Sequence, residues 1–209
     1  MNLRVLTTKA IGSHGSEGAA MEVMQAIKER RSIRKYKPDP VSDEAIDTVL
    51  DAARWAPSWA NTQCWRFVVV RDAEIRARLA GALRATSPGK ENRAAAAIRS
   101  APVVIVACAE LGRSGYYKGE QTTDKGDWFM FDVALAMQNL TLAAHAIGLG
   151  TVHVGLFEAK EAAKVLEVPA DVAVVEMTPL GYPDEEPAAP RRKELAEIVF
   201  QGNYGGEQL

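Results

Sequence analysis

Cysteine and histidine are scarce in this sequence of 209 residues, which contains two cysteines and three histidines. Two cysteines give no disulfide framework, and no Cys/His spacing or HExxH pattern indicates a zinc site. No run approaches the ~18 apolar residues of a membrane span, and no apolar secretory signal opens the chain. The net charge of -2 argues against nucleic acid, whose binders usually carry a large positive excess. We therefore expect a cytoplasmic protein with no metal, no nucleic-acid partner and no membrane segment.

What is present is the composition of an ordinary globular protein, with 47% hydrophobic and 25% charged residues. The length predicts one domain with a sizeable core. Residues 1–20 are weakly patterned and contain glycine and serine, so we interpret them as a leader or poorly structured arm. An upstream start, with Met21 as the natural beginning, is the alternative. A single domain is then expected at residues 21–209.

The stretch RRSIRKY, residues 30–36, concentrates positive charge directly behind an amphipathic helix expected at residues 20–30. The apolar residues of that helix have the i, i+3, i+4, i+7 spacing of one buried face: Ala20, Val23, Met24 and Ile27. Past the helix, Arg30, Ser32 and Arg34 alternate, so extended backbone would aim them to one side. Guanidinium groups and a hydroxyl suit a phosphate, because the arginine fork matches its geometry. A solvated basic turn is the alternative interpretation.

Several other segments have clear helix or strand patterns. Ser42 and Asp72 are expected to cap two further helices. The apolar run at residues 103–107 predicts a central strand. The segment at residues 127–147 is the most hydrophobic helix and should be buried nearly all round, as a central helix or at an oligomer interface. Further strands are expected at residues 67–70, 151–156 and 172–177.

In three segments the apolar residues have neither the spacing of a helix nor the alternation of a strand. PSWANTQCWRF, residues 57–67, is polar and aromatic. Residues 111–126 are polar and contain four glycines, and a long stretch of this kind in a compact domain is often a functional lid. The tail, residues 191–209, has a second basic cluster and some apolar residues, but it is too short for its own core. We expect it to dock elsewhere, for example on a partner subunit.

Four of these stretches together resemble the nitroreductase family, the FMN-dependent NAD(P)H oxidoreductases. They are RRSIRKY, PSWANTQCWRF, AAHAIGLGTVHVG at residues 143–155, and GYPDEEPAAPRRKELAEIV from Gly181. The resemblance covers about residues 21–199. It implies an α+β fold with a central mixed, largely antiparallel sheet of four or five strands flanked by helices. It also implies an intertwined homodimer in which the C-terminal tails are exchanged.

The resemblance further implies two FMN sites at the dimer interface, each built from both subunits. The residues implied for the flavin phosphate are Arg30, Ser32, Arg34 and Arg192, with Arg31 nearby. Those implied beside the flavin ring and ribityl chain are Pro57, Ser58, Asn61 and Gln63, although the last three also suit the simple turning of a loop. The backbone of Val154 and Gly155 is implied near flavin N5, where the missing Cβ of glycine permits a close approach.

Two positions depart from the family pattern, which commonly has a small residue at Trp59 and a proline at Cys64. We expect Trp59 in the substrate pocket. The candidate pocket covers are Tyr116, Tyr117 and Trp128, although solvent-exposed loop aromatics would look the same. Cys64 is interpreted as a small buried residue, because no histidine is near it in the sequence.

The implied activity is hydride transfer from NAD(P)H to FMN and reduction of nitroaromatic, quinone or related small acceptors by a ping-pong mechanism. The flavin carries this chemistry, so no residue is assigned as catalytic. One alternative is a family member that uses its flavin for another reaction, such as dehalogenation, enone reduction or flavin cleavage. The other, of a different class, is a module that binds or stores FMN without turnover.

Overall fold

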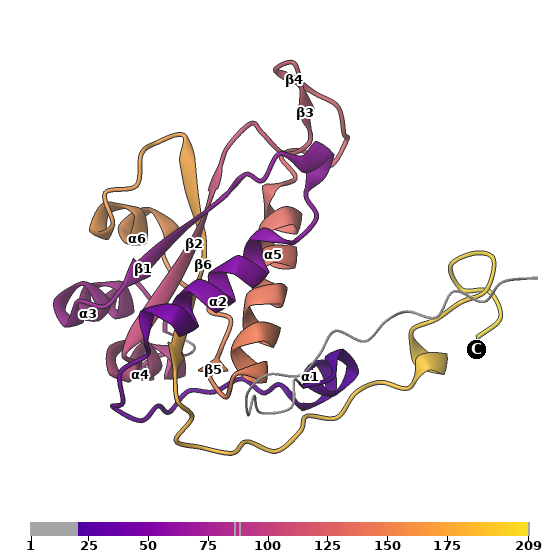
Figure 1. Cartoon of the computed structure of the whole chain (residues 1–209). Helices are drawn as coiled ribbons and strands as arrows, with labels where there is room; N and C mark the ends of the chain where they lie inside the picture. The colour runs from indigo at the N-terminus through magenta and orange to yellow at the C-terminus, as the bar shows by residue number, and fades with distance from the viewer. Residues whose placement is uncertain (1–20, 86, 88, 209) are drawn as a thin grey trace, which may run out of the picture.

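A computed structural model describes residues 21–85, 87 and 89–208 (Figure 1). The expected leader at residues 1–20 lies outside the described residues. The core is an antiparallel sheet with the order β1 (Trp65–Val70), β2 (Val103–Glu110), β6 (Val172–Gly181), β5 (Gly150–Thr151). A parallel bridge between Ser32 and Thr151 makes the pairing mixed. The expected α+β class with a mixed, largely antiparallel sheet is therefore confirmed.

Helices cover both faces of the sheet. On one face lie α2 (Asp43–Arg54) and α5 (Phe129–Ala146), and on the other lie α3 (Ala73–Gly81), α4 (Arg93–Ser100) and α6 (Ala159–Val165). Alternate residues of β2 enter the two cores: Val103, Ile105, Ala107 and Ala109 pack with α2 and α5, and Val104, Val106 and Cys108 pack with the other helices. Because both faces are covered, the strand is apolar from Val103 to Ala109. This confirms the central strand.

The helix starts follow the predicted caps. The Ser42 hydroxyl accepts a hydrogen bond from the Ala45 amide at 3.2 Å, and the Asp72 carboxylate accepts one from Ile75 at 2.8 Å. Such caps stabilise a helix by about 1 kcal/mol each. Asn92, which the sequence patterns did not single out, caps α4 in the same way.

Two helices expose apolar surface that the sequence predicted to be buried. In α1 (Val23–Glu29) the side chains of Val23, Met24 and Ile27 are 68%, 60% and 50% exposed, and only Ala26 is buried. In α5 one face is buried, but Met130 and Phe131 are 57% and 52% exposed. The burial predicted for the apolar face of α1 is wrong for the single chain, and α5 is buried on one face only, so its burial at an oligomer interface stays a prediction. The apolar periodicity holds, but nothing within the described residues covers these faces.

The remaining segments differ from the sequence predictions in how regular they are. The strand predicted at residues 151–156 is wrong beyond Thr151: the chain leaves the sheet edge and returns only at Val154, which exchanges two backbone hydrogen bonds with Met177. Residues 111–126 contain a short hairpin of β3 (Tyr116–Tyr117) and β4 (Glu120–Gln121). Beyond β6 the tail runs past α1 and away from the sheet, with one short turn, η2 (Leu195–Glu197) (Figure 1).

Candidate functional site

The segment that follows α1 is held in an extended conformation against β5. The Ile33 amide donates to the Thr151 carbonyl at 2.9 Å, and Ser32 bridges the same residue. A Cβ on Gly150 would lie 2.8 Å from the Cβ of Ile33, so only glycine permits this close packing. Ile33 is therefore buried, and the alternating neighbours Ser32 and Arg34 lie on the other side of the extended backbone.

Arg30 is the centre of a cluster of three arginines. Burial, together with the positive charges of Arg192 and Arg31, lowers the pKa of the Arg30 guanidinium. Its Nη1 is buried and has no hydrogen-bond acceptor among the described residues. Arg31 is engaged locally, since its Nη1 donates to the carbonyls of Lys28 and Arg30 at 2.7 and 2.9 Å. A buried guanidinium nitrogen that lacks an acceptor and lies among like charges fits an anion such as a phosphate.

A cavity of about 610 Å³ brings Arg34 together with two other segments, residues 152–156 and residues 90–94. Val154 and Gly155 line it, and a Cβ on Gly155 would meet open space. Lys90, Asn92 and Arg93 also line the cavity and were missed, because they follow a Pro/Gly break with no recognisable motif. The open space beside Gly155 lets a group approach the backbone closely. Glu91 also lines the cavity, and the charges of Arg34, Lys90 and Arg93 outweigh it, so the lining is positive.

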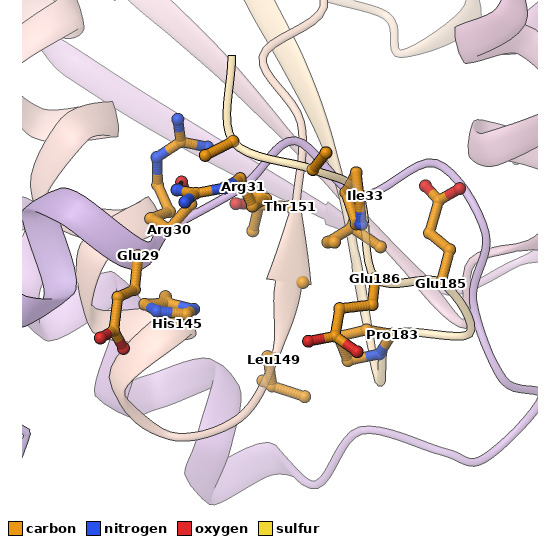
Figure 2. Close-up of a pocket in the computed structure, with 14 residues that line it drawn as sticks. Glu29, Arg30, Arg31, Ile33, His145, Leu149, Thr151, Pro183, Glu185 and Glu186 are labelled. Atoms are coloured by element: carbon orange, nitrogen blue, oxygen red, sulfur yellow. Dashed lines mark hydrogen bonds between the residues drawn. The ribbon is translucent and has the colours of Figure 1, made fainter. Parts of the chain in front are cut away.

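A second cavity, of about 660 Å³, lies between the end of α1, the end of α5 and the connector at residues 183–189 (Figure 2). Figure 2 shows Arg30 and Arg31 on one side and Glu185 and Glu186 on the other. His145 also lines it, and burial lowers the pKa of this histidine, so the ring is neutral at pH 7. Because the glutamates oppose the arginines across this cavity, only its arginine side suits an anion.

The loop at residues 58–63 contains the short turn η1 (Trp59–Asn61) and has an unusual backbone. Ala60, Asn61 and Gln63 have positive φ angles of 43°, 56° and 47°. Such angles cost roughly 1–2 kcal/mol for a residue such as Ala60 or Gln63 and less for an asparagine. The Ser58 hydroxyl accepts from the Gln63 amide at 3.0 Å, and the Asn61 side chain accepts from Gln63 Nε2 at 3.3 Å. Ser58, Asn61 and Gln63 therefore form the hydrogen bonds of a turned loop, which was the alternative role for them. Asn61 and Gln63 remain exposed.

The first turn of α5 anchors this loop. Asp132 is 1% exposed, and its carboxylate accepts the Trp59 amide with both oxygens, at 3.1 and 3.2 Å. The Cys64 thiol lies 3.7 Å from the same carboxylate. Burial, and then the charge of Asp132, raises the pKa of Cys64 to about 12, so it is a neutral buried thiol as expected. Asp132 was missed, although a single acid in a strongly apolar helix was a usable signal.

The hairpin is anchored at the same end of α5. The Trp128 amide donates to the Ser114 carbonyl at 3.0 Å, and the Asp127 carboxylate accepts the Gly112 amide at 2.7 Å. The four aromatic residues predicted for the pocket therefore belong to segments that meet at the start of α5 (Figure 1): Trp59, Tyr116, Tyr117 and Trp128.

The arginine cluster lies at the other end of this helix, where His145 and Arg30 line the same cavity. A rise of 1.5 Å per residue puts about 20 Å between Asp132 and His145. A single chain thus brings the predicted residues together as two separate groups. One group contains Arg30, Arg31, Ser32, Arg34, Val154, Gly155 and Arg192, and the other contains Pro57, Ser58, Asn61, Gln63 and the four aromatic residues.

A family model described as the nitroreductase family matches residues 27–182. The chain belongs to the nitroreductase family. One relative of this nitroreductase-family chain is a protein from Methanothermobacter thermautotrophicus that is named as an NADH dehydrogenase/NAD(P)H nitroreductase. The two sequences are 34% identical over 80% of each chain. Another, from Rhodospirillum rubrum, is named 5,6-dimethylbenzimidazole synthase and is 33% identical over 79% of this chain and 84% of its own.

Solved structures of the family have the same fold. A nitroreductase from Desulfovibrio desulfuricans, solved in complex with FMN, matches with a TM-score of 0.68 and 32% identity over 90% of this chain and 99% of its own. Within the described ranges of the present nitroreductase-family chain, no helix has the length and apolarity to cross a membrane. The same ranges hold no cluster of three or more metal-binding side chains.

Proposed function

We propose that this protein is an FMN-dependent oxidoreductase that takes hydride from NAD(P)H and reduces nitroaromatic, quinone or related small acceptors. The observation that carries the proposal is the buried Nη1 of Arg30, which lies within an arginine cluster and has no hydrogen-bond partner in the part of the chain that the structure describes. The FMN held by one relative and the NAD(P)H in the name of another support the choice of cofactors.

In this proposal Arg30, Ser32, Arg34 and Arg192 hold the flavin phosphate. The backbone of residues 154–155 receives the ring, and Lys90 and Arg93 place positive charge in the same cavity. When bound, FMN supplies the electron-transfer chemistry. The protein binds it, orients it and favours its reduced, more negative form through these charges.

The proposed working form is a cytoplasmic homodimer of one domain per chain, at residues 21–209, with each FMN site shared between two subunits. Its support is the exposed apolar surface of α1 and α5 and the tail, where Leu195 and Ile198 are 66% and 53% exposed. A second copy that covers these faces brings the loop at residues 58–63 of one subunit to the arginine cluster of the other. Obligate interfaces bury roughly 2,000–5,000 Å², so dilution should not yield a stable monomer.

Anaerobic addition of NADH or NADPH to the purified yellow protein tests the enzymatic role. We expect the flavin absorption to bleach and to return when a nitroaromatic or quinone is added. Because one flavin serves both substrates in turn, steady-state rates should give parallel double-reciprocal lines. Retention of the yellow colour in the presence of both nucleotides would indicate a binding or storage module instead.

A second function within the family is favoured by one observation, the relative named 5,6-dimethylbenzimidazole synthase. If the protein uses its flavin for a different reaction of this kind, NAD(P)H would bleach the flavin absorption. No member of a panel of nitroaromatics and quinones would then be turned over. The same experiment therefore separates the two functions.

Trp59 tests the proposed substrate pocket. A large indole beside the flavin excludes bulky acceptors, so we expect Trp59→Ala to keep FMN and to raise kcat/KM for large aromatics relative to small ones. The rate of flavin reduction by NAD(P)H should change less. Trp55→Ala is the matched control, because Trp55 is 73% exposed and lies against Arg54. Loss of dimer stability with an unchanged acceptor profile would place Trp59 in the interface instead.

A further inference from the structure

We propose that Asp132 is a positioning residue for the flavin-facing loop at residues 58–63, an inference that rests on the proposed FMN site. The carboxylate is buried within α5, and both oxygens accept the amide of Trp59. Asp132 thereby holds the backbone at the point where it changes from the extended conformation of Ser58 to the left-handed conformation that begins at Ala60.

The surroundings of Asp132 explain why its charge is directed at the loop. No cation lies within salt-bridge distance of this carboxylate among the described residues. A buried carboxylate needs hydrogen-bond donors, and within the described residues these are the Trp59 amide and the Cys64 thiol. The positive end of the α5 dipole adds a favourable electrostatic interaction. Trp59 and Cys64 lie at the two ends of the loop, so one carboxylate fixes both ends.

The loop cannot hold its conformation through local preference alone. Ala60 and Gln63 carry side chains at positive φ, which is unfavourable for both, whereas Asn61 tolerates its positive φ better. Without the contact at Trp59, these residues are expected to relax toward the right-handed region. The exposed side chains of Asn61 and Gln63 would then point elsewhere, and the flavin ring would lose its partners while the phosphate stays bound at the arginine cluster.

Asp132→Asn is the primary test, because it keeps the size of the side chain but replaces one acceptor by a donor that opposes the Trp59 amide or the thiol. We expect the variant to remain dimeric and yellow. The visible circular dichroism of the flavin and its midpoint potential should shift, and KM for the acceptor should rise about tenfold, the effect of one lost charge-assisted hydrogen bond. Amide hydrogen exchange at residues 58–63 should become faster in the apoprotein.

Asp127→Asn is the matched control. Asp127 lies five residues earlier, just before α5 begins, and accepts the amides of Gly112 and Phe129, so it anchors the hairpin and not the loop. This variant should leave the flavin dichroism, the potential and the exchange at residues 58–63 unchanged.

A second pair of variants covers the case in which Asp132→Asn fails to fold. Trp59→Pro removes the amide hydrogen, and Trp59→Ala keeps it, while both lack the indole. Ser58 already has the extended backbone that a following proline requires, with φ -139° and ψ 161°. Both variants lose any effect of the indole on the flavin, so compared with Trp59→Ala, Trp59→Pro should show a further shift of the flavin dichroism and faster loop exchange.

Unchanged flavin dichroism, potential and KM in Asp132→Asn, or equal spectra for the two Trp59 variants, would overturn the inference. If the unchanged protein binds no FMN, the proposed function fails instead. The exchange measurement on the apoprotein then decides by itself whether Asp132 holds the loop.

Discussion

Replacement of Arg30 and Arg192 by alanine is expected to give a folded but colourless protein. The two residues are far apart in the sequence, yet their charges are close enough for Arg192 to lower the pKa of Arg30. Each charge-assisted hydrogen bond contributes about 1.5–3 kcal/mol, so the loss of two should weaken FMN binding by about 10²–10⁴-fold. Folding should survive, because the change also removes repulsion between neighbouring like charges.

The matched control is Arg71→Ala with Arg78→Ala, which removes the same charge from two exposed positions, one just before α3 and one within it. It should keep full FMN content. The measurement is the ratio of flavin to protein absorbance after gel filtration, with circular dichroism as the check on folding. Full retention of FMN by the Arg30/Arg192 variant would show that the phosphate lies elsewhere.

The sequence was most informative where chemistry is concentrated in a short stretch. The charges and alternation of residues 30–36 predicted a site for an anion, and the structure holds that stretch extended against Thr151. The caps at Ser42 and Asp72 and the central strand were predictable for the same reason, since each depends on neighbours in the sequence.

Other features could not be predicted because they depend on contacts between distant segments. The apolar periodicity of α1 predicts that a face is covered but does not say by which chain, and Val23, Met24 and Ile27 are exposed in the single subunit. Lys90 joins the cavity beside Gly155 only through the packing of α4. Asp132 acts on a backbone amide, which any residue at position 59 except proline would present.

The second large effect is expected when two variants that each bind FMN poorly form a mixed dimer. The first carries Arg30→Ala and Arg192→Ala, and the second carries Asn61→Ala and Gln63→Ala. Loss of two neutral hydrogen bonds should weaken FMN binding in the second variant by about 10–100-fold. If each site combines the arginine cluster of one subunit with the loop of the other, the mixed dimer has one fully altered site and one intact site.

The most direct test of a shared FMN site is therefore the flavin content of this mixed dimer, prepared by co-expression of two differently tagged chains. FMN is supplied at a concentration that fills the unchanged protein but neither variant alone. We predict half of the normal flavin content, all of it bleached by NAD(P)H. A mixed dimer as colourless as its parents would contradict a shared site, because sites built within single chains would each remain damaged.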